Sequence, residues 1–155
     1  LYITWRDCKM KTGYLNRNSG NGGMLIPVEF VNGAKTLEAV KDSGKVFTLD
    51  AAGGAYSITL PTALEVGINY KLIIDENTPT GAITIAAGSA ILFGKIAESE
   101  VDTSDDNPGS SGATGVSNLI FGTSAEQGDY VEIVCDGAKW YYYGNAAKDG
   151  ADTTS

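Results

Sequence analysis

The sequence predicts an all-β protein: a single antiparallel β-sandwich or barrel, jelly-roll-like, with an extended N-terminal arm. Three observations favour this class. Apolar and polar residues alternate with a period of two, turn residues recur at short intervals, and the 155 residues include 20 glycines. A chain of this length can bury a core without a disulfide scaffold. We expect an arm and flexible joint at 1–23, a folded domain at 24–145 and a C-terminal tail at 146–155.

The arm combines aromatic and basic side chains and ends in a stretch, 18–23, of Asn, Ser and Gly that is unsuited to the inside of an element. Residues 1–45 carry seven Lys or Arg and four Asp or Glu, a net charge of +3, whereas 46–155 carry four basic and fifteen acidic residues, a net charge of −11. An acidic domain repels phosphates and anionic lipid, so we expect neither nucleic acid nor a membrane as partner. The arm either meets an acidic protein surface or is solvated. Its candidate contact residues are Tyr2, Trp5, Arg6, Lys9, Lys11, Tyr14 and Arg17.

Strands are expected from residue 24 onward. Pro27 marks 24–31 as an edge strand because proline cannot donate to a central ladder, and 36–41 is expected to form one helical turn. Eight more regular strands follow, at Val46–Asp50, Tyr56–Leu60, Asn69–Asp75, Ala82–Ala86, Ala90–Phe93, Asn118–Phe121, Asp129–Cys135 and Trp140–Tyr143. Glycines at 53–54 and 137 predict hairpin tips, since glycine reaches positive φ without steric cost.

A long polar loop is expected from Glu98 to Gly115, and it is the only place where the sequence suggests a metal. Its acids Glu100, Asp102, Asp105 and Asp106 offer the oxygen ligands that calcium prefers, but their spacing does not match an EF-hand loop. We therefore expect a solvated loop, no metal and no cofactor.

The chain has no histidine, which excludes catalytic triads built on that side chain and removes the commonest transition-metal ligand. We expect no enzymatic activity. The two cysteines have neither zinc-knuckle nor redox spacing. Cys135 lies in an alternating strand and is expected in the core; Cys8 is expected to be a free thiol, unless the arm folds back to pair with Cys135.

The aromatic run Trp140, Tyr141, Tyr142 and Tyr143 is the strongest local feature. Because consecutive strand residues point to opposite faces, at least two of these rings must leave the core side. They are candidates for stacking on a glycan or for anchoring a subunit interface, unless other parts of the fold cover them.

The span 43–143 resembles small structural proteins of tailed bacteriophages, in particular capsid decoration (cement) proteins. The residues that carry the resemblance are Ser43–Gly54 (SGKVFTLDAAGG), Ile58–Pro61 (ITLP), Tyr70–Ile74 (YKLII), Gly81–Ile85 (GAITI) and Gly128–Tyr141 (GDYVEIVCDGAKWY). The last of these, a strand between Gly-Asp and Asp-Gly followed by Trp-Tyr, also occurs in phage tail fibres and spikes.

The resemblance implies a homotrimer on the outer surface of the virion, bound to the major capsid protein and stabilising the phage head. It supplies no catalytic residues, and the arm lies outside it. In this interpretation the arm docks on the capsid protein. The alternative is a glycan- or receptor-binding β-domain of a tail fibre, spike or head fibre, with Trp140 and Tyr142 stacking on sugar.

Overall fold

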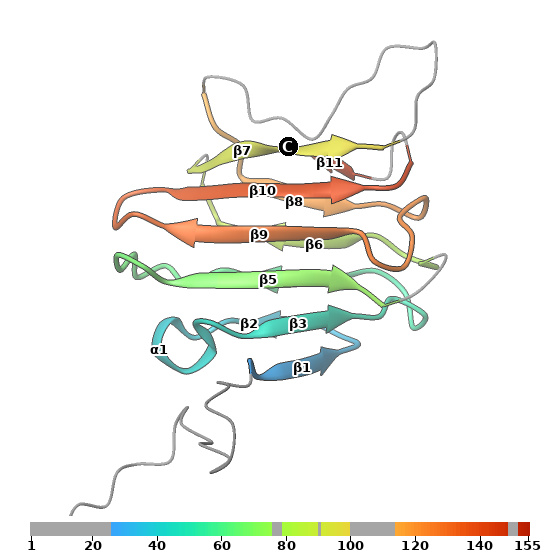
Figure 1. The fold of residues 1–155 in the computed structure, drawn as a ribbon, viewed down its shortest axis with the longest axis horizontal. Coiled ribbons are helices and arrows are strands. Elements are labelled where there is room, and N and C mark those ends of the chain that lie inside the picture. The colour runs from blue at the N-terminus through green and yellow to red at the C-terminus, as the bar shows by residue number, and fades with distance from the viewer. Residues whose placement is uncertain (1–25, 76–78, 90, 100–113, 149–151) are drawn as a thin grey trace, which may run out of the picture.

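The computed structural model describes residues 26–75, 79–89, 91–99, 114–148 and 152–155. Over these residues the chain forms eleven strands and one helical turn, in two mixed sheets (Figure 1). Sheet A has the order β1-β3-β5-β9-β10-β7, with strands Val28–Val31, Val46–Leu49, Asn69–Ile74, Tyr130–Cys135, Trp140–Ala146 and Leu92–Glu98. Sheet B has the order β11-β8-β6-β4-β2, with strands Asp152–Thr154, Asn118–Phe121, Ile83–Ala86, Tyr56–Thr59 and Lys35–Thr36.

The first six strands wind as a coil that alternates between the two sheets. Odd-numbered strands enter sheet A and even-numbered strands enter sheet B, so that β1, β3 and β5 run parallel, as do β2, β4 and β6. Figure 1 shows the arrows of β1, β3 and β5 pointing the same way. The later strands β8 and β9 close this coil by pairing antiparallel with β6 and β5.

The all-β class is confirmed, but the expected antiparallel arrangement is wrong. Five strand pairs are parallel, and over the described residues the two sheets are separate rather than one closed barrel. The turn at 53–54 is not a hairpin tip, because β3 and β4 belong to different sheets. A glycine-rich turn serves a crossing between sheets as well as it serves a hairpin, and the sequence does not distinguish them.

The predicted hairpin at Gly137 is confirmed. Strands β9 and β10 pair antiparallel with Cys135 opposite Trp140. The Asp136 carboxylate accepts hydrogen bonds from the backbone N–H groups of Ala138 and Lys139, both at 2.8 Å, and Gly137 has φ +96°. These contacts form an Asx-type turn that sets the register of the two strands.

All eight strands expected between 46 and 143 are present, most within two residues of the expected ends. Strand β7 continues to Glu98 and β10 to Ala146, because their parallel pairing extends over seven residue pairs. Strand β2 and helix α1 (Ala39–Asp42) replace the single helical turn expected at 36–41. Strand β11 pairs with β8, so the folded domain reaches past 145 into the expected tail.

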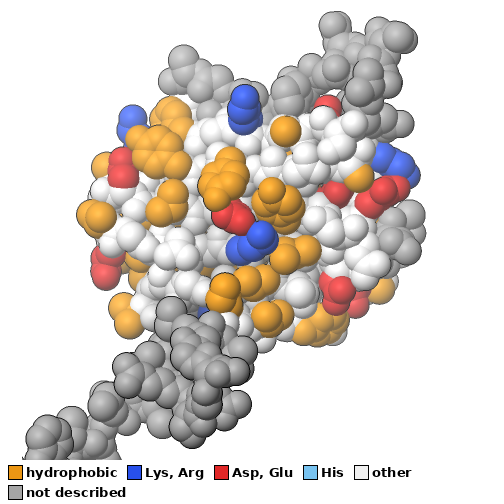
Figure 2. Space-filling model, viewed as in Figure 1, with side chains coloured by type: hydrophobic (Ala, Val, Ile, Leu, Met, Phe, Trp, Pro, Cys, Tyr) orange, Lys and Arg blue, Asp and Glu red, His pale blue; other side chains and the backbone are white. Residues whose placement is uncertain are grey.

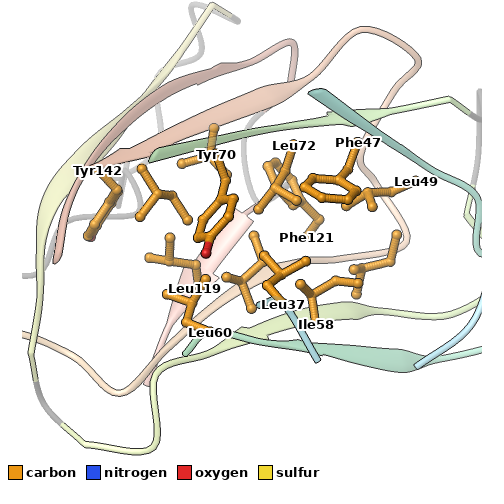
Figure 3. Packing of buried hydrophobic residues seen from close by; sticks show 14 of the residues in the cluster. Leu37, Phe47, Leu49, Ile58, Leu60, Tyr70, Leu72, Leu119, Phe121 and Tyr142 are labelled. Atoms are coloured by element: carbon orange, nitrogen blue, oxygen red, sulfur yellow. The ribbon is translucent and has the colours of Figure 1, made fainter. Parts of the chain in front are cut away.

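The core lies between the sheets. Figure 3 shows Phe47 and Leu72 from sheet A together with Ile58 and Leu119 from sheet B, and all four side chains are fully buried. Cys135 is buried as expected and has a free thiol. Cys8 lies outside the described residues. No helix in the described part of the chain is long and apolar enough to cross a membrane.

A cluster of ion pairs links the two sheets next to the connection between β1 and β2. Glu29 in sheet A pairs with Lys35 in sheet B at 2.7 Å and with Lys45 at 3.0 Å, and Lys45 also pairs with Asp42 at 2.6 Å. The other oxygen of Asp42 accepts the backbone N–H of Glu38 at 2.9 Å. Asp42 is only 1% exposed, so the cluster provides partners for a carboxylate that burial would otherwise penalise.

These contacts shift the pKa values of the cluster. Burial acts to raise the pKa of Asp42, but the hydrogen bonds from Lys45 and the Glu38 N–H outweigh it, and the pKa is lowered. Hydrogen bonds from Lys35 and then Lys45 lower the pKa of Glu29. Burial acts to lower the pKa of Lys45, but the two carboxylates raise it overall. The charged forms of all three groups are therefore favoured in the folded state.

Candidate functional site

The outward face of sheet A is the candidate site. Residues paired in register point to the same side of a sheet, so the strand registers assign this face directly. The row through its middle, here called the central row, runs from β1 to β7 through Val28, Val46, Lys71, Glu132, Tyr143 and Lys95. The row on one side of it contains Phe30, Thr48, Ile73, Tyr130, Asn145 and Ala97, and the row on the other contains Asn69, Val134, Tyr141 and Phe93.

Exposed apolar side chains concentrate on this face. Of the eight large hydrophobic residues exposed in the described part of the chain, six belong to sheet A's outward side or lead into it: Ile26, Val28, Phe30, Val134, Tyr141 and Tyr143. Figure 2 shows hydrophobic side chains gathered over this face around one acidic and one basic side chain. Their clustering, rather than their number, is what distinguishes the face from an ordinary surface.

The charged pair at the centre of the face is Lys71 and Glu132, on the neighbouring strands β5 and β9, with N···O 2.8 Å. The Tyr143 hydroxyl also donates to Glu132, and the Lys71 ammonium lies 4.5 Å from the centre of the Tyr130 ring. Hydrogen bonds from Lys71 and then Tyr143 lower the pKa of Glu132, and the same Glu132 bond raises the pKa of Tyr143. These bonds hold the pair in place, and the lowered pKa favours the charged form of Glu132.

A shallow depression lies beside this pair. It is lined on the outward side by Ile26, Gly44, Val46 and Asn69, together with Lys71, Glu132, Val134 and Tyr143. Gly44 has no side chain and φ +79°, and its N–H donates to the Asn69 carbonyl at 2.8 Å, which places it level with Asn69 on the face. The depression is therefore a gap in the row of side chains, with an aromatic wall at Tyr143.

The β9–β10 end of the face has a second aromatic group. The rings of Phe93 and Tyr141 lie with centroids 6.5 Å apart, and Lys139 lies 4.6 Å from the Phe93 ring centre. The nearby negative charge of Asp136 raises the pKa of Tyr141. This end therefore combines the exposed ring of Tyr141 and the half-buried ring of Phe93 with one charge of each sign.

The outward face of sheet B is different in kind. Its strands present Thr36, Ser57, Thr59, Thr84, Ala86, Asn118 and Ile120. It bears no aromatic side chain and no charge at these positions. The two faces of the domain are thus unequal, and the exposed aromatic and aliphatic side chains lie on sheet A.

For the aromatic run 140–143, only the expected alternation between the two faces of the strand is confirmed. Trp140 is fully buried and Tyr142 is 3% exposed, whereas Tyr141 and Tyr143 are 43% and 57% exposed. The proposal that Trp140 and Tyr142 stack on a sugar is therefore wrong, because both rings belong to the core. The expected arm residues 2–17 and the loop acids Glu100, Asp102, Asp105 and Asp106 lie outside the described residues.

Several residues of the face were not singled out from the sequence, among them Phe30, Lys71, Ile73, Tyr130 and Glu132. The signal was present in the alternation: if Val131, Ile133 and Cys135 face the core, then Tyr130, Glu132 and Val134 face outward. The order of the strands, which brings these positions together, could not be predicted from the sequence.

The described residues contain no group of three or more His, Cys, Asp or Glu side chains that could hold a metal ion. The buried carboxylate of Asp129 has a structural role: it accepts backbone N–H groups of Glu126 and Ala147, both at 2.8 Å, and so joins the start of β9 to the end of β10.

No protein-family model matches the chain, and a comparison with curated proteins found no match.

Proposed function

We propose that this chain is a capsid decoration (cement) protein of a tailed bacteriophage, bound to the outer surface of the major capsid protein and stabilising the head. We base the phage origin on the resemblance of 43–143 to phage structural β-domains. The observation that carries the adhesive role is the exposed aromatic and aliphatic face of sheet A, set on a domain whose opposite face has mainly small polar side chains at its paired strand positions. We read the two facing sheets as a β-sandwich variant of that family, with a structural and non-catalytic role.

The residues of the resemblance have identifiable structural tasks. Asp129 ties the ends of β9 and β10 together, Asp136 and Gly137 form the turn, and Trp140 fills the core. The last segment of the resemblance, 128–141, is therefore accounted for by the construction of the β9–β10 hairpin, and the resemblance supports a class of structural β-domain. The adhesive role is supported by the surface.

The arm supplies the contact with the coat in this proposal. On the domain side of the arm, the described residues begin at Ile26, which is 62% exposed and lines the depression on sheet A. The arm's basic and aromatic residues suit strand addition and ring burial on an acidic coat surface. Several arms held together release slowly, because once one is bound the others act at high effective concentration.

The test is binding to capsids of the encoding phage that were assembled without this chain. We expect saturable, stoichiometric binding, and a variant lacking residues 1–17 should fold normally by circular dichroism yet fail to bind. Absence of saturable binding by the full chain would refute the capsid role. Full occupancy by the shortened variant would refute the role of the arm.

A receptor- or glycan-binding role is the second candidate, favoured by the exposed Tyr141 beside Phe93 and Asp136. A glycan array distinguishes it. Specific binding that is lost in Tyr141→Ser, together with no binding to capsids, would favour this role over decoration.

A further inference from the structure

We propose that the outward face of sheet A binds the same face of a second copy of this chain, about a two-fold axis that runs along the strands between β5 and β9. The place of this dimer in the capsid rests on the proposed function, whereas the dimer itself forms without capsids. A two-fold contact requires a self-complementary surface, because the same patch serves on both sides. Three features of the face meet that requirement.

The first feature is the central charge pair. Lys71 on β5 and Glu132 on β9 are neighbours in register, one on each side of the axis. Rotation by 180° places Lys71 opposite Glu132 of the partner subunit, and Glu132 opposite Lys71 of the partner subunit. The two ion pairs become a square of alternating charges at the centre of the contact, where unlike charges meet and like charges do not.

The second feature is the division of the apolar residues. Aliphatic Val28 and Val46 lie on the β1–β3 side of the central row, and Tyr143 and the stem of Lys95 lie on the β10–β7 side. The same rotation lays the aliphatic side of one copy on the aromatic side of the other. Val46 then meets Tyr143 of the partner subunit, and Val28 meets Lys95 of the partner subunit, whose carbon stem can pack while its ammonium stays in water.

The third feature is the depression. It lies where Gly44 leaves a gap at the level of Asn69 on the β3 side of the face. Tyr141 occupies the equivalent level on β10, and it is 43% exposed. The rotation carries Tyr141 of the partner subunit over Gly44, so that an exposed ring enters a gap of matching position. The position of the Tyr141 ring over the gap and the arrangement of the Lys71 and Glu132 charges are thus consistent with the same two-fold axis.

This geometry gives the proposed decoration role a mechanism. The two β1 strands of a dimer, which the arms precede in the sequence, lie on opposite edges of the contact, separated by five strand spacings, or about 24 Å. Each dimer can therefore hold two coat subunits at once. The contact differs from the homotrimer that the resemblance implies, and measurement of the oligomeric state separates the two.

The experiment uses the full chain in sedimentation velocity at about 0.15 M salt, a Debye length of about 8 Å. We expect a dimer for the unmodified chain. Lys71→Glu and Glu132→Lys should each raise the dimer dissociation constant at least about 100-fold, because each variant places four like charges at the centre. An equimolar mixture of the two variants should regain the dimer, since the acids of one then face the lysines of the other.

The mixture is decisive because each variant lacks its own internal ion pair, and only an intermolecular contact explains recovery. Ser57→Glu, on the outward face of sheet B, is the matched control and should remain dimeric. Circular dichroism verifies that all variants are folded. A monomer or trimer for the unmodified chain, or no recovery in the mixture, would overturn the dimer. Capsid binding by a monomeric chain would overturn the dimer and leave the decoration role standing.

Discussion

Replacing Asp42 with alanine tests how much the ion cluster next to the β1–β2 connection contributes to the free energy of unfolding. The substitution removes the acceptor of Lys45 at 2.6 Å and of the Glu38 N–H at 2.9 Å. Removing one partner of a buried ion pair costs roughly 3–5 kcal/mol. Lys45 keeps Glu29 at 3.0 Å, so we expect the lower end, a loss of about 3 kcal/mol in the free energy of unfolding. For a chain of this size that corresponds to a melting temperature lower by about 6–12 °C.

The assay is equilibrium urea unfolding followed by far-ultraviolet circular dichroism. Asp42→Asn keeps an acceptor for the Glu38 N–H and should lose less than Asp42→Ala. Lys41→Ala is the control in the same helical turn: its pair with Glu38 is exposed on both sides and should leave the urea midpoint unchanged. A loss below about 1 kcal/mol for Asp42→Ala would show that the cluster does not hold this end of the fold.

The same cluster predicts the dependence of stability on pH. The folded-state pKa values of Asp42 and Glu29 are lowered, so their contribution is complete above the unfolded pKa values of about 4 and is lost as the pH falls through the folded values. Unfolding free energy should therefore be level from about pH 7 to 5 and decline below about pH 4. In Asp42→Ala the decline should be shallower, and an equal slope in both proteins would contradict the assignment.

Three further substitutions test the packing of the hairpin and its neighbours by the same unfolding assay. Gly94→Ala should prevent stable folding, because at φ +156° a Cβ there would lie 1.8 Å from the Tyr142 carbonyl oxygen. The control Gly53→Ala should be tolerated, because a Cβ there meets nothing within 4 Å. Equal stability of the two variants would contradict this geometry. Asp129→Ala should lower the free energy of unfolding by about 2–4 kcal/mol, because it leaves two backbone N–H groups without an acceptor. A change within error would show that these two hydrogen bonds do not stabilise the hairpin. Trp140→Phe should cost less than about 2 kcal/mol, since it also removes a buried indole N–H that has no acceptor in the described part of the chain; a loss above about 3 kcal/mol would contradict this.

Strand positions could be predicted from the sequence because they depend on local alternation and on turn residues. The segment Val131 to Cys135 shows this: its alternate residues face the core as the period of two requires. The same rule, carried through the four-residue turn at 136–139, places Trp140 opposite Cys135 and hence in the core. That step was available from the sequence, and it would have excluded Trp140 from a binding surface.

Strand order could not be predicted, because it depends on which sheet each strand enters. The residues between β3 and β4 form turns, with Asp50 accepting the Ala52 N–H at 2.7 Å, as they would in a hairpin. Only the pairing of β3 with β5, across a separation of 25 residues along the chain, shows that the turn crosses between sheets. The candidate face depends on this order, since Lys71 and Glu132 are 61 residues apart in sequence.

The parallel pairing of β1 with β3 also has a mechanical consequence. Pro27 precedes β1, and the carbonyls of Pro27 and Val31 accept the N–H groups of Val46 and Asp50 at 3.0 and 2.9 Å. Tension applied through the arm along this strand loads the whole ladder in shear, so its bonds must yield together. Under the proposed capsid role, a force that pulled the arm in this direction would therefore meet the resistance of the entire strand and would not separate it one bond at a time.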